Sequence, residues 1–371
     1  MVMFVASLIG VNLASSETLA TLPVTFSIVG LALGIFPVAW TTERIGRKKC
    51  FMLFLWIGAF ACYLSSKAIE ASSFTGFCFG IFLLGFALAA VQQFRYAAIE
   101  CLGVDRAPTA ASIILSGGIF AAFAGPEIAV AGKNFTETDY EGSFWLASLS
   151  LILASLILSM FKPAKLESAD KTTSSTKFAD LVNRKFCVAI ASGVIGYGVM
   201  SFVMTATPIS MHHMFMHSLE ETKWVVQSHI AAMFLPSLIS PLLFRWLGTI
   251  NMMKLGVAAF VITIVVGYNF TSVAGFWVQL VALGIGWNFL FVAGTSLLSE
   301  SYSSENALKA QAVNDGMIFG VQALTSVAAG ISMAHMNWAG LLTLSLVPTV
   351  LFALLLAWYL TNSRNQKNST E

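Results

Sequence analysis

The chain has 371 residues, of which 57% are hydrophobic, 12% aromatic and only 10% charged, and its mean hydropathy is +0.81. Soluble domains carry roughly a quarter charged residues, because they must present a water-wettable surface. The composition therefore excludes a soluble enzyme or nucleic-acid-binding protein, and it predicts a chain whose exterior lies largely in lipid. The formal net charge of +2 is too small to identify a partner.

Polar interruptions divide the chain into twelve apolar blocks, most of them about as long as a helix that crosses a bilayer. The blocks are continuous rather than alternating, which favours helices, because lipid offers no partner to an unpaired strand edge. The first block is short for a span, so we expect a first helix that is either short or truncated. In chain order the blocks are 2–14, 20–40, 50–68, 74–96, 108–131, 143–161, 186–211, 224–247, 253–270, 273–298, 307–332 and 338–360.

Lysine and arginine are distributed unevenly between the loops. If the loop after the second block is cytoplasmic, sixteen of the 20 basic residues fall on that side, three fall outside and Arg95 lies within a block. Cytoplasmic loops are enriched in Lys and Arg, so the pattern predicts that both termini are cytoplasmic. We expect a multi-pass protein of the bacterial inner membrane that works as a monomer in the lipid bilayer, with no nucleic-acid partner.

Residues 162–185 differ sharply from the rest of the chain, because nine of these 24 residues are charged. This predicts a cytoplasmic linker between an N-terminal six-helix half, 1–161, and a C-terminal six-helix half, 186–361, followed by a cytoplasmic tail, 362–371. An offset of 199 residues aligns Gly76 with Gly275 and Gly85 with Gly284, which indicates an internal repeat. Parallel repeats of six-helix halves are one of the main transporter plans, with the substrate site near the midplane between them.

The loop after the second block carries the most specific motif. Residues 39–48 read Ala-Trp-Thr-Thr-Glu-Arg-Ile-Gly-Arg-Lys. The motif resembles the signature of the major facilitator superfamily, Gly-x-x-x-Asp-Arg-x-Gly-Arg-Lys/Arg, with Ala39 for the first glycine and Glu43 for the aspartate. With the blocks, linker and repeat, the resemblance covers essentially the whole chain and implies an all-α fold of two six-helix bundles related by pseudo-twofold symmetry. The motif residues are Ala39, Glu43, Arg44, Gly46, Arg47 and Lys48.

Family resemblance assigns a gating role to Glu43. A carboxylate at the cytoplasmic end of the second helix can sit against the N-terminus of the eleventh helix and separate from it when the halves move apart. The alternative is that the cations of this loop only anchor it to anionic headgroups and fix the topology. The counterpart in the second half is reduced to Arg245-Trp-Leu-Gly248.

The fifth block contains Gly117, Gly118, Gly125 and Pro126. This pattern is similar to the family's antiporter motif, which centres on Gly-Pro. Small residues permit close helix approach and proline loosens a helix, as suits an interface that opens and shuts. The motif favours export slightly, and the alternative is a kink in a packed helix.

Ionisable residues inside the blocks are candidates for coupling, because an unpaired ion in lipid is costly. Glu127 could carry a proton or be a buried neutral group. For Arg95 three arrangements are open: a salt bridge to Asp315 of the other half, bidentate binding of an anionic substrate, or a local pair with Glu43 or Glu100. His229 could sense protons or be a hydrogen-bonded interior histidine.

Polar and aromatic residues in the first, fourth, seventh and tenth helices are candidates for the substrate cavity, because the family resemblance implies that these helices line it. A few hydrogen-bonding groups among aromatic rings suit a small organic molecule better than an inorganic ion. Helix packing is the alternative role for each residue. The candidates are Asn12, Gln92, Gln93, Tyr197, Trp287 and Asn288.

These features predict a secondary transporter that moves a small organic solute by alternating access, coupled to protons, and that is not an enzyme. No hydrolase, zinc-protease or phosphate-binding motif occurs, so we expect no cofactor and no direct use of ATP. We also expect no metal site, because His212, His213 and His217 lack the spacing of a ligand set. The alternatives are a proton-coupled importer of a small nutrient and a membrane receptor built on the same fold.

Overall fold

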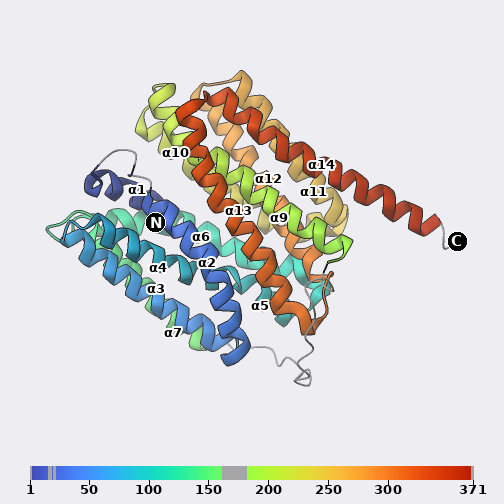
Figure 1. Ribbon diagram of the computed structural model, residues 1–371, viewed down its shortest axis with the longest axis horizontal. Coiled ribbons are helices and arrows are strands. Elements are labelled where there is room, and N and C mark those ends of the chain that lie inside the picture. The colour runs from blue at the N-terminus through green and yellow to red at the C-terminus, as the bar shows by residue number, and fades with distance from the viewer. Residues whose placement is uncertain (1, 16–18, 20–21, 161–181, 369–371) are drawn as a thin grey trace. The chain divides into compact units, whose positions relative to one another are not determined.

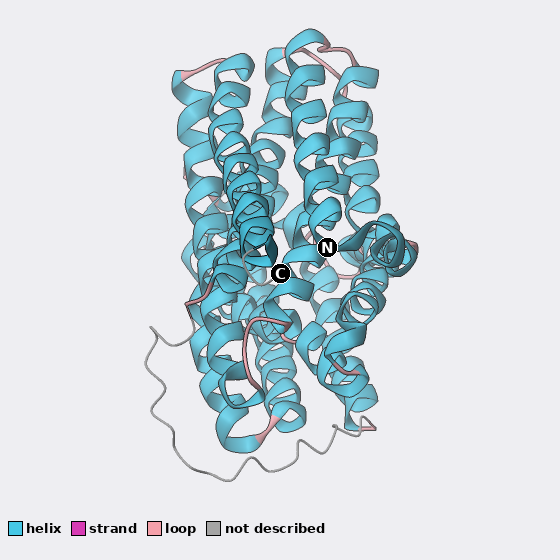
Figure 2. Cartoon of the chain, turned by 90° about the vertical axis from the view of Figure 1, so that its right-hand side faces the viewer, coloured by secondary structure: helices cyan, strands magenta, loops and turns pink. Residues whose placement is uncertain are grey.

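The computed structural model describes all residues except 1, 16–18, 20–21, 161–181 and 369–371. Within this part of the chain every regular element is a helix (Figure 2). The described residues of the twelve predicted blocks are largely helical (Figure 1), but block 224–247 is divided between α10, a short 3-10 helix (Leu235–Leu238) and α11, and α11 also contains nearly all of block 253–270. The main helices are α1 (Val2–Leu13), α2 (Leu22–Ile45), α3 (Arg47–Glu70), α4 (Phe74–Gln92), α5 (Phe94–Leu102), α6 (Ala107–Lys133), α7 (Glu141–Ser159), α9 (Arg184–Ile209), α10 (Leu219–Phe234), α11 (Ser240–Asn269), α12 (Val273–Ser299), α13 (Ala307–His335) and α14 (Trp338–Asn368).

The described helices fit a polytopic membrane protein. Nine candidate spans within the described residues are long and apolar enough to cross a bilayer, whereas α1 and α10 are shorter, with 12 and 16 residues. The predicted linker falls largely on residues 161–181, which lie outside the description; α9 begins at Arg184, where Asn183 caps it by accepting from the Phe186 N–H at 3.0 Å. At the other end, α14 continues to Asn368. The chain is thus an integral, multi-pass protein.

Two glycines turn the chain between consecutive spans. Gly46 separates α2 from α3 with φ 79° and ψ 160°, and Gly248 kinks α11 with φ 74° and ψ 164°. This region of backbone conformation is essentially restricted to glycine. The two motifs recognised in the sequence, around Arg44 and Arg245, therefore end in the same turn, and only glycine fits there.

The internal repeat is visible in how helices begin. Ser73 caps α4 by accepting from the Gly76 N–H at 3.2 Å, and Ser272 caps α12 by accepting from the Gly275 N–H at the same distance. Side-chain capping of this kind satisfies a backbone donor that the helix leaves unpaired. The two caps lie 199 positions apart, which is the offset found in the sequence.

The helices form two compact units, and each unit contains segments from both halves of the sequence. Unit 1 comprises Met1–Cys101, Phe120–Asp170 and Gln311–Ala323, and unit 2 comprises Leu102–Ile119, Lys171–Ala310 and Leu324–Glu371. In unit 1, α4 packs against α2 and α3, and α3 packs against α7; in unit 2, α12 packs against α9, α10 and α11, and α14 packs against α9 and α11. Each unit thus holds a short segment from the other half of the sequence.

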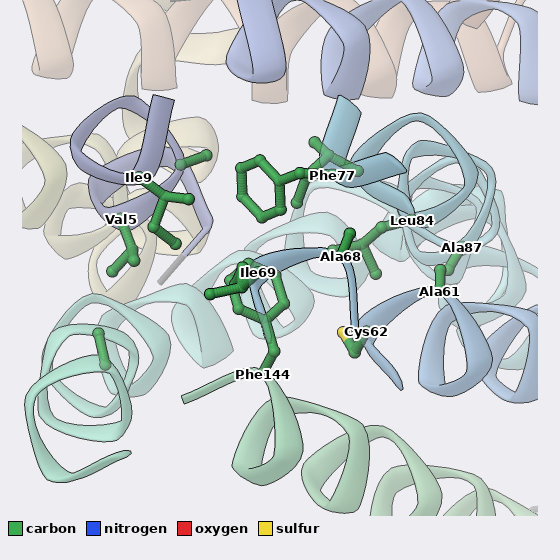
Figure 3. Packing of buried hydrophobic residues seen from close by; sticks show 13 residues of the cluster. Val5, Ile9, Ala61, Cys62, Ala68, Ile69, Phe77, Leu84, Ala87 and Phe144 are labelled. Atoms are coloured by element: carbon green, nitrogen blue, oxygen red, sulfur yellow. The ribbon is translucent and has the colours of Figure 1, made fainter. Parts of the chain in front are cut away.

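A continuous apolar cluster forms the core of unit 1 (Figure 3). It joins Val5 and Ile9 of α1 to Ile69 of α3, Phe77 of α4 and Phe144 of α7. The Phe77 and Phe144 rings meet edge to face, with 5.6 Å between centroids, an arrangement that suits the quadrupoles of the two rings. Nearby, α2 and α4 cross closely at Gly30 and Gly85, where small residues let two helix backbones approach.

Gly85→Ala should destabilise unit 1, because the added Cβ would lie 2.5 Å from the Ser27 carbonyl oxygen and 2.6 Å from the Leu31 nitrogen, both backbone atoms. Overpacking of this kind costs about 1–3 kcal/mol. The control is Gly330→Ala, since nothing lies within 4 Å of a Cβ at that position. Thermal unfolding in detergent should show a lower melting temperature for Gly85→Ala alone; equal melting temperatures would contradict the close crossing.

Candidate functional site

A break between α4 and α5 creates the polar centre of unit 1. The fourth apolar block is interrupted at Gln93, whose N–H bonds to the Ala90 carbonyl at 3.1 Å, and helical structure resumes at Phe94. The residues just after the break, Arg95 and Tyr96, are both buried. The chain thus places a cation inside a mostly apolar unit, where it requires an anionic partner.

Asp315 of α13 is that partner. The Arg95 guanidinium donates through Nη2 to Asp315 Oδ1, and the two side chains are 2% and 0% exposed. Tyr96 OH donates to the same oxygen at 2.9 Å, and Asn314 Nδ2 donates to it at 2.9 Å. Arg95 Nη1 is held in turn by the Gln92 carbonyl at 2.9 Å. Of the three arrangements open for Arg95, the structure contains the ion pair with Asp315.

A second buried cation, Arg47, contacts the same stretch of α13. It is the first residue of α3, directly after the Gly46 turn. Its guanidinium donates two hydrogen bonds to Glu100, from Nε to Oε2 at 2.6 Å and from Nη2 to Oε1. Nη2 also donates to Gln311 Oε1 at 2.9 Å. The guanidinium also reaches Gln93 Oε1 at 3.4 Å. Bidentate arginine–carboxylate pairs are strong and directional, so α3, α5 and the first turns of α13 are tied together within unit 1.

The centre of unit 2 is aromatic rather than ionic. Tyr197 of α9 lies edge to face with Trp287 and with Phe291 of α12, each with 5.2 Å between ring centroids. Trp287 and Phe291 are stacked at 5.2 Å, and Phe234 of α10 packs edge to face on Trp287 at 5.9 Å. The indole Nε1 of Trp287 is buried without a hydrogen-bond partner among the described residues. A buried indole N–H usually finds a partner, so this unpaired donor is unusual for a buried tryptophan.

Two polar side chains accompany the aromatic rings in unit 2. Asn288 donates to the Met233 carbonyl and to Ser237 Oγ, both at 2.7 Å, while its Oδ1 accepts no bond within the described part of the chain. His229 places Nδ1 2.8 Å from the Leu280 carbonyl, and its Nε2 is buried without a described partner. Buried polar atoms without a hydrogen-bond partner are unusual in proteins.

The other residues of the loop motif occupy different environments. Ala39 is buried in α2, whereas Glu43 and Arg44 are exposed, and the Arg44 guanidinium lies 3.9 Å from the centroid of the Trp40 ring. Lys48 donates to the Ser159 carbonyl of α7. No hydrogen bond or ion pair to a described residue involves Glu43. In this structure Arg47, rather than Glu43, makes the contact with α13.

The glycines of α6 differ in their surroundings. A Cβ on Gly118 would lie 2.6 Å from the ring of Phe234, whereas nothing lies within 4 Å of one on Gly117. Gly118 is thus what allows α6 to lie against the aromatic centre of unit 2. Gly125 is partly buried, and the side chain of Pro126 lies outside the description.

Two further candidates are exposed. Glu127 of α6 and Asn12 of α1 both present exposed side chains, and neither takes part in a hydrogen bond with another described residue.

The structure divides the other predicted cavity residues between the two units. Gln92 and Gln93 serve the ionic centre of unit 1, whereas Tyr197, Trp287 and Asn288 lie together in unit 2.

Four residues of the ionic centre were not predicted as site residues: Tyr96, Glu100, Gln311 and Asn314. Of these, only Glu100 was considered in the sequence, as a local partner of Arg95. Glu100 carried a usable signal, because it is a carboxylate directly beside an apolar block that contains an arginine. Asn314 and Gln311 were recognisable only as polar neighbours of Asp315. Tyr96 carried no signal beyond its position next to Arg95.

Metal ligands are not gathered at either centre. In the part of the chain that the structure describes, no three His, Cys, Asp or Glu residues are placed to hold a metal ion. His217 lies 2.7 Å from the Thr271 carbonyl through Nε2. The side chains of His212 and His213 lie outside the description.

Comparisons with known proteins agree on one family. The family model of the Major Facilitator Superfamily matches residues 1–214. The riboflavin transporter RfnT of Brucella anthropi is 33% identical over 364 residues, covering 94% of this chain and 90% of RfnT. The uncharacterized MFS-type transporter YddS of Bacillus subtilis is 25% identical, covering 96% and 86%. The fucose:proton symporter FucP of E. coli has a similar fold, with a TM-score of 0.61 at 13% identity, covering 96% of this chain and 95% of FucP.

Removing one partner of the buried pair should destabilise the protein strongly. Arg95→Gln or Asp315→Asn leaves an uncompensated charge in the interior, which costs about 3–5 kcal/mol. The double variant Arg95→Gln/Asp315→Asn has no such charge and should melt above both single variants.

The control for this experiment is the Lys185–Glu300 pair, in which N and O lie 3.2 Å apart and both side chains are more than 40% exposed. Neutralising one partner of such a surface pair costs about 1 kcal/mol or less. Thermal unfolding in detergent measures both series. A double variant that melts as low as the sum of the single losses would show that Arg95 and Asp315 do not act as a pair.

Proposed function

Because the chain belongs to the major facilitator superfamily and is a transporter of a small-molecule substrate, we propose that its substrate is a small organic solute with a flat aromatic ring system. Riboflavin is the first candidate, since a relative with 33% identity is named a riboflavin transporter. The observation that carries the proposal is the buried aromatic centre of Tyr197, Trp287 and Phe291 in unit 2.

The aromatic centre has the chemistry that a planar heterocycle requires. Aromatic rings pair with another ring at 4.5–7 Å between centroids, and in this structure the rings of Trp287 and Phe291 are buried against their neighbours, with 1% and 2% exposed. Beside the rings, the N–H of Trp287 and the Oδ1 of Asn288 offer one donor and one acceptor without partners in the described structure. Ligand sites combine apolar walls with a few such polar groups. An inorganic ion would use none of the aromatic surface.

We propose that the ionic centre of unit 1 takes part in alternating access. Asp315 and Gln311 belong to the C-terminal half of the sequence, yet their segment, Gln311–Ala323, is part of unit 1. We propose that the Arg95–Asp315 and Arg47–Gln311 contacts form a latch that must open when the two sequence halves separate. Separating a buried ion pair is costly, because it works against the attraction between the two charges.

A proton on Asp315 would remove the attraction that holds this side chain to Arg95, although Arg95 keeps its own charge, so we propose Asp315 as the coupling residue. The carboxylate keeps one oxygen, Oδ2, without a hydrogen bond from the described residues, and a proton can bind there while Oδ1 still accepts from Tyr96 and Asn314. Glu127 and His229 remain alternative coupling groups.

Two directions of transport are compatible with proton coupling. The Gly-Pro motif of α6 favours export in exchange for protons, whereas the named substrate of RfnT favours import of a nutrient. We propose export as the direction of transport, on the basis of the Gly-Pro motif, and import as the second candidate. The protein would act as a monomer in a bacterial inner membrane, with both termini cytoplasmic.

Trp287→Ala should weaken riboflavin binding by roughly tenfold, because it removes one ring that would contact the flavin, worth about 0.5–1.5 kcal/mol, and one N–H donor, worth about 0.5–1.5 kcal/mol. Trp277→Ala is the matched control: it lies on the same helix and stacks on Trp224 at 5.8 Å, away from the aromatic centre of Tyr197. Quenching of flavin fluorescence by purified protein measures the affinity. Equal affinities of the two variants would exclude the aromatic centre as the flavin site.

Arg95→Gln/Asp315→Asn should lose movement driven by an imposed pH gradient while it keeps efflux of preloaded solute down its own gradient. The measurement uses proteoliposomes with gradients of both signs, which also gives the direction of coupling. Glu127→Gln should behave as the unmodified protein. If Glu127→Gln alone abolishes gradient-driven transport, the proposed role of Asp315 is wrong.

A receptor that binds its ligand without moving it is the alternative of a different class. It predicts retained flavin binding with no flux in either direction in the same proteoliposomes.

A further inference from the structure

A small apolar groove lies between α11 and α14 in unit 2, where the two helices pack side by side (Figure 1). Its volume is about 180 Å³. Sites for compact organic ligands measure about 300–1,000 Å³, so the groove suits a chain-like group rather than a second solute. It is lined by Lys254, Val257, Ala353, Leu356, Ala357 and Leu360.

The groove has one polar end. The helix α11 contains nearly all of the ninth predicted block and α14 contains the twelfth, so the prediction from the sequence is that they run in opposite directions across the membrane. Lys254, near the Gly248 turn, therefore lies at the same end as Leu360, near the end of the span in α14. Along the rest of the groove, the small side chains of Ala353 and Ala357 leave the space that a larger residue would fill. The lining is therefore apolar apart from one cation.

The charge at this end is not balanced by protein carboxylates. Lys254 Nζ donates to Asn251 Oδ1 at 3.0 Å, which is a neutral group. The sequences of α11 and α14 contain no Asp or Glu, but they contain Arg245, Lys254, Arg364 and Lys367. Within the described structure Lys254 takes part in no ion pair. The polar end of the groove is thus complementary to an anion.

A neighbouring contact places this end at the membrane surface. Trp358 of α14 is about half exposed, and the Arg184 guanidinium lies 5.8 Å from the centroid of its ring. Tryptophan collects at the level of the lipid headgroups, and arginine or lysine beside it faces anionic lipid. Lys254 therefore lies at the end of the groove where a lipid phosphate would lie.

We propose that this groove binds one anionic phospholipid, with an acyl chain along Ala353 and Ala357 and the phosphate at Lys254. Lipid tails meet the same apolar surface everywhere on the protein, so the cation and the shape of the groove select this lipid. The site is independent of the solute that the protein carries.

Native mass spectrometry of the purified full chain in detergent tests the proposal. The probes are phosphatidylglycerol and phosphatidylcholine with identical acyl chains. The unmodified protein should retain phosphatidylglycerol about fivefold better, the preference expected from one lysine near an anionic headgroup. Lys254→Gln should remove that preference, and Arg245→Gln, an exposed cation of the same helix that does not line the groove, should keep it. No preference in the unmodified protein, or an unchanged preference in Lys254→Gln, would overturn the proposal.

Ala357→Phe tests the acyl-chain space independently of the headgroup contact. The phenylalanine ring would occupy that space, while Lys254 stays in place. Retention of phosphatidylglycerol should fall to that of phosphatidylcholine. Melting temperatures show whether the variant is folded; Ala357 is exposed, and substitutions at exposed positions rarely unfold a protein. Unchanged retention would mean that the lipid binds by its headgroup alone and would overturn the groove as the site.

Discussion

The buried pair of Arg95 and Asp315 is the constraint on which the arrangement of unit 1 depends. An arginine side chain that is 2% exposed in a largely apolar helical unit requires a carboxylate at hydrogen-bond distance, and the chain provides it 220 residues away. The break of α4 at Gln93 and the inclusion of Gln311–Ala323 in unit 1 both serve this contact. Tyr96 and Asn314 then donate to the same oxygen, Asp315 Oδ1, while Oδ2 accepts no bond from the described residues.

The two units divide the chemistry of the protein between them. Unit 1 holds the ionic groups, centred on Arg95 and Arg47, and we propose that they couple transport to protons. Unit 2 holds the aromatic groups, centred on Trp287, and we propose that they bind the solute.

Much of the fold was predictable because its signals are local or periodic. Continuous apolar blocks specify membrane helices through the cost of unpaired backbone groups in lipid. The loop motif and its counterpart in the second half were recognised from the sequence, and their glycines, Gly46 and Gly248, adopt the same glycine-only conformation. The offset of 199 residues anticipated that α4 and α12 begin with equivalent serine caps.

The partners within the candidate site were not predictable to the same degree, because they depend on which distant helix faces meet. Arg95 had three possible arrangements in the sequence, and only the position of α13 selects Asp315. The loop motif directed attention to Glu43, but the direction in which α3 leaves Gly46 places Arg47 inward and leaves Glu43 exposed. The break at Gln93 contains neither Pro nor Gly, so no local signal marks it.

We propose that this member of the major facilitator superfamily moves a flat aromatic solute across a membrane, with riboflavin as the first candidate. Counterflow measures this most directly: proteoliposomes loaded with unlabelled riboflavin are diluted into a trace of labelled riboflavin, with no ion gradient imposed. Transient accumulation of label above that of protein-free liposomes is the predicted result. Label that never exceeds the protein-free level would contradict riboflavin as the solute.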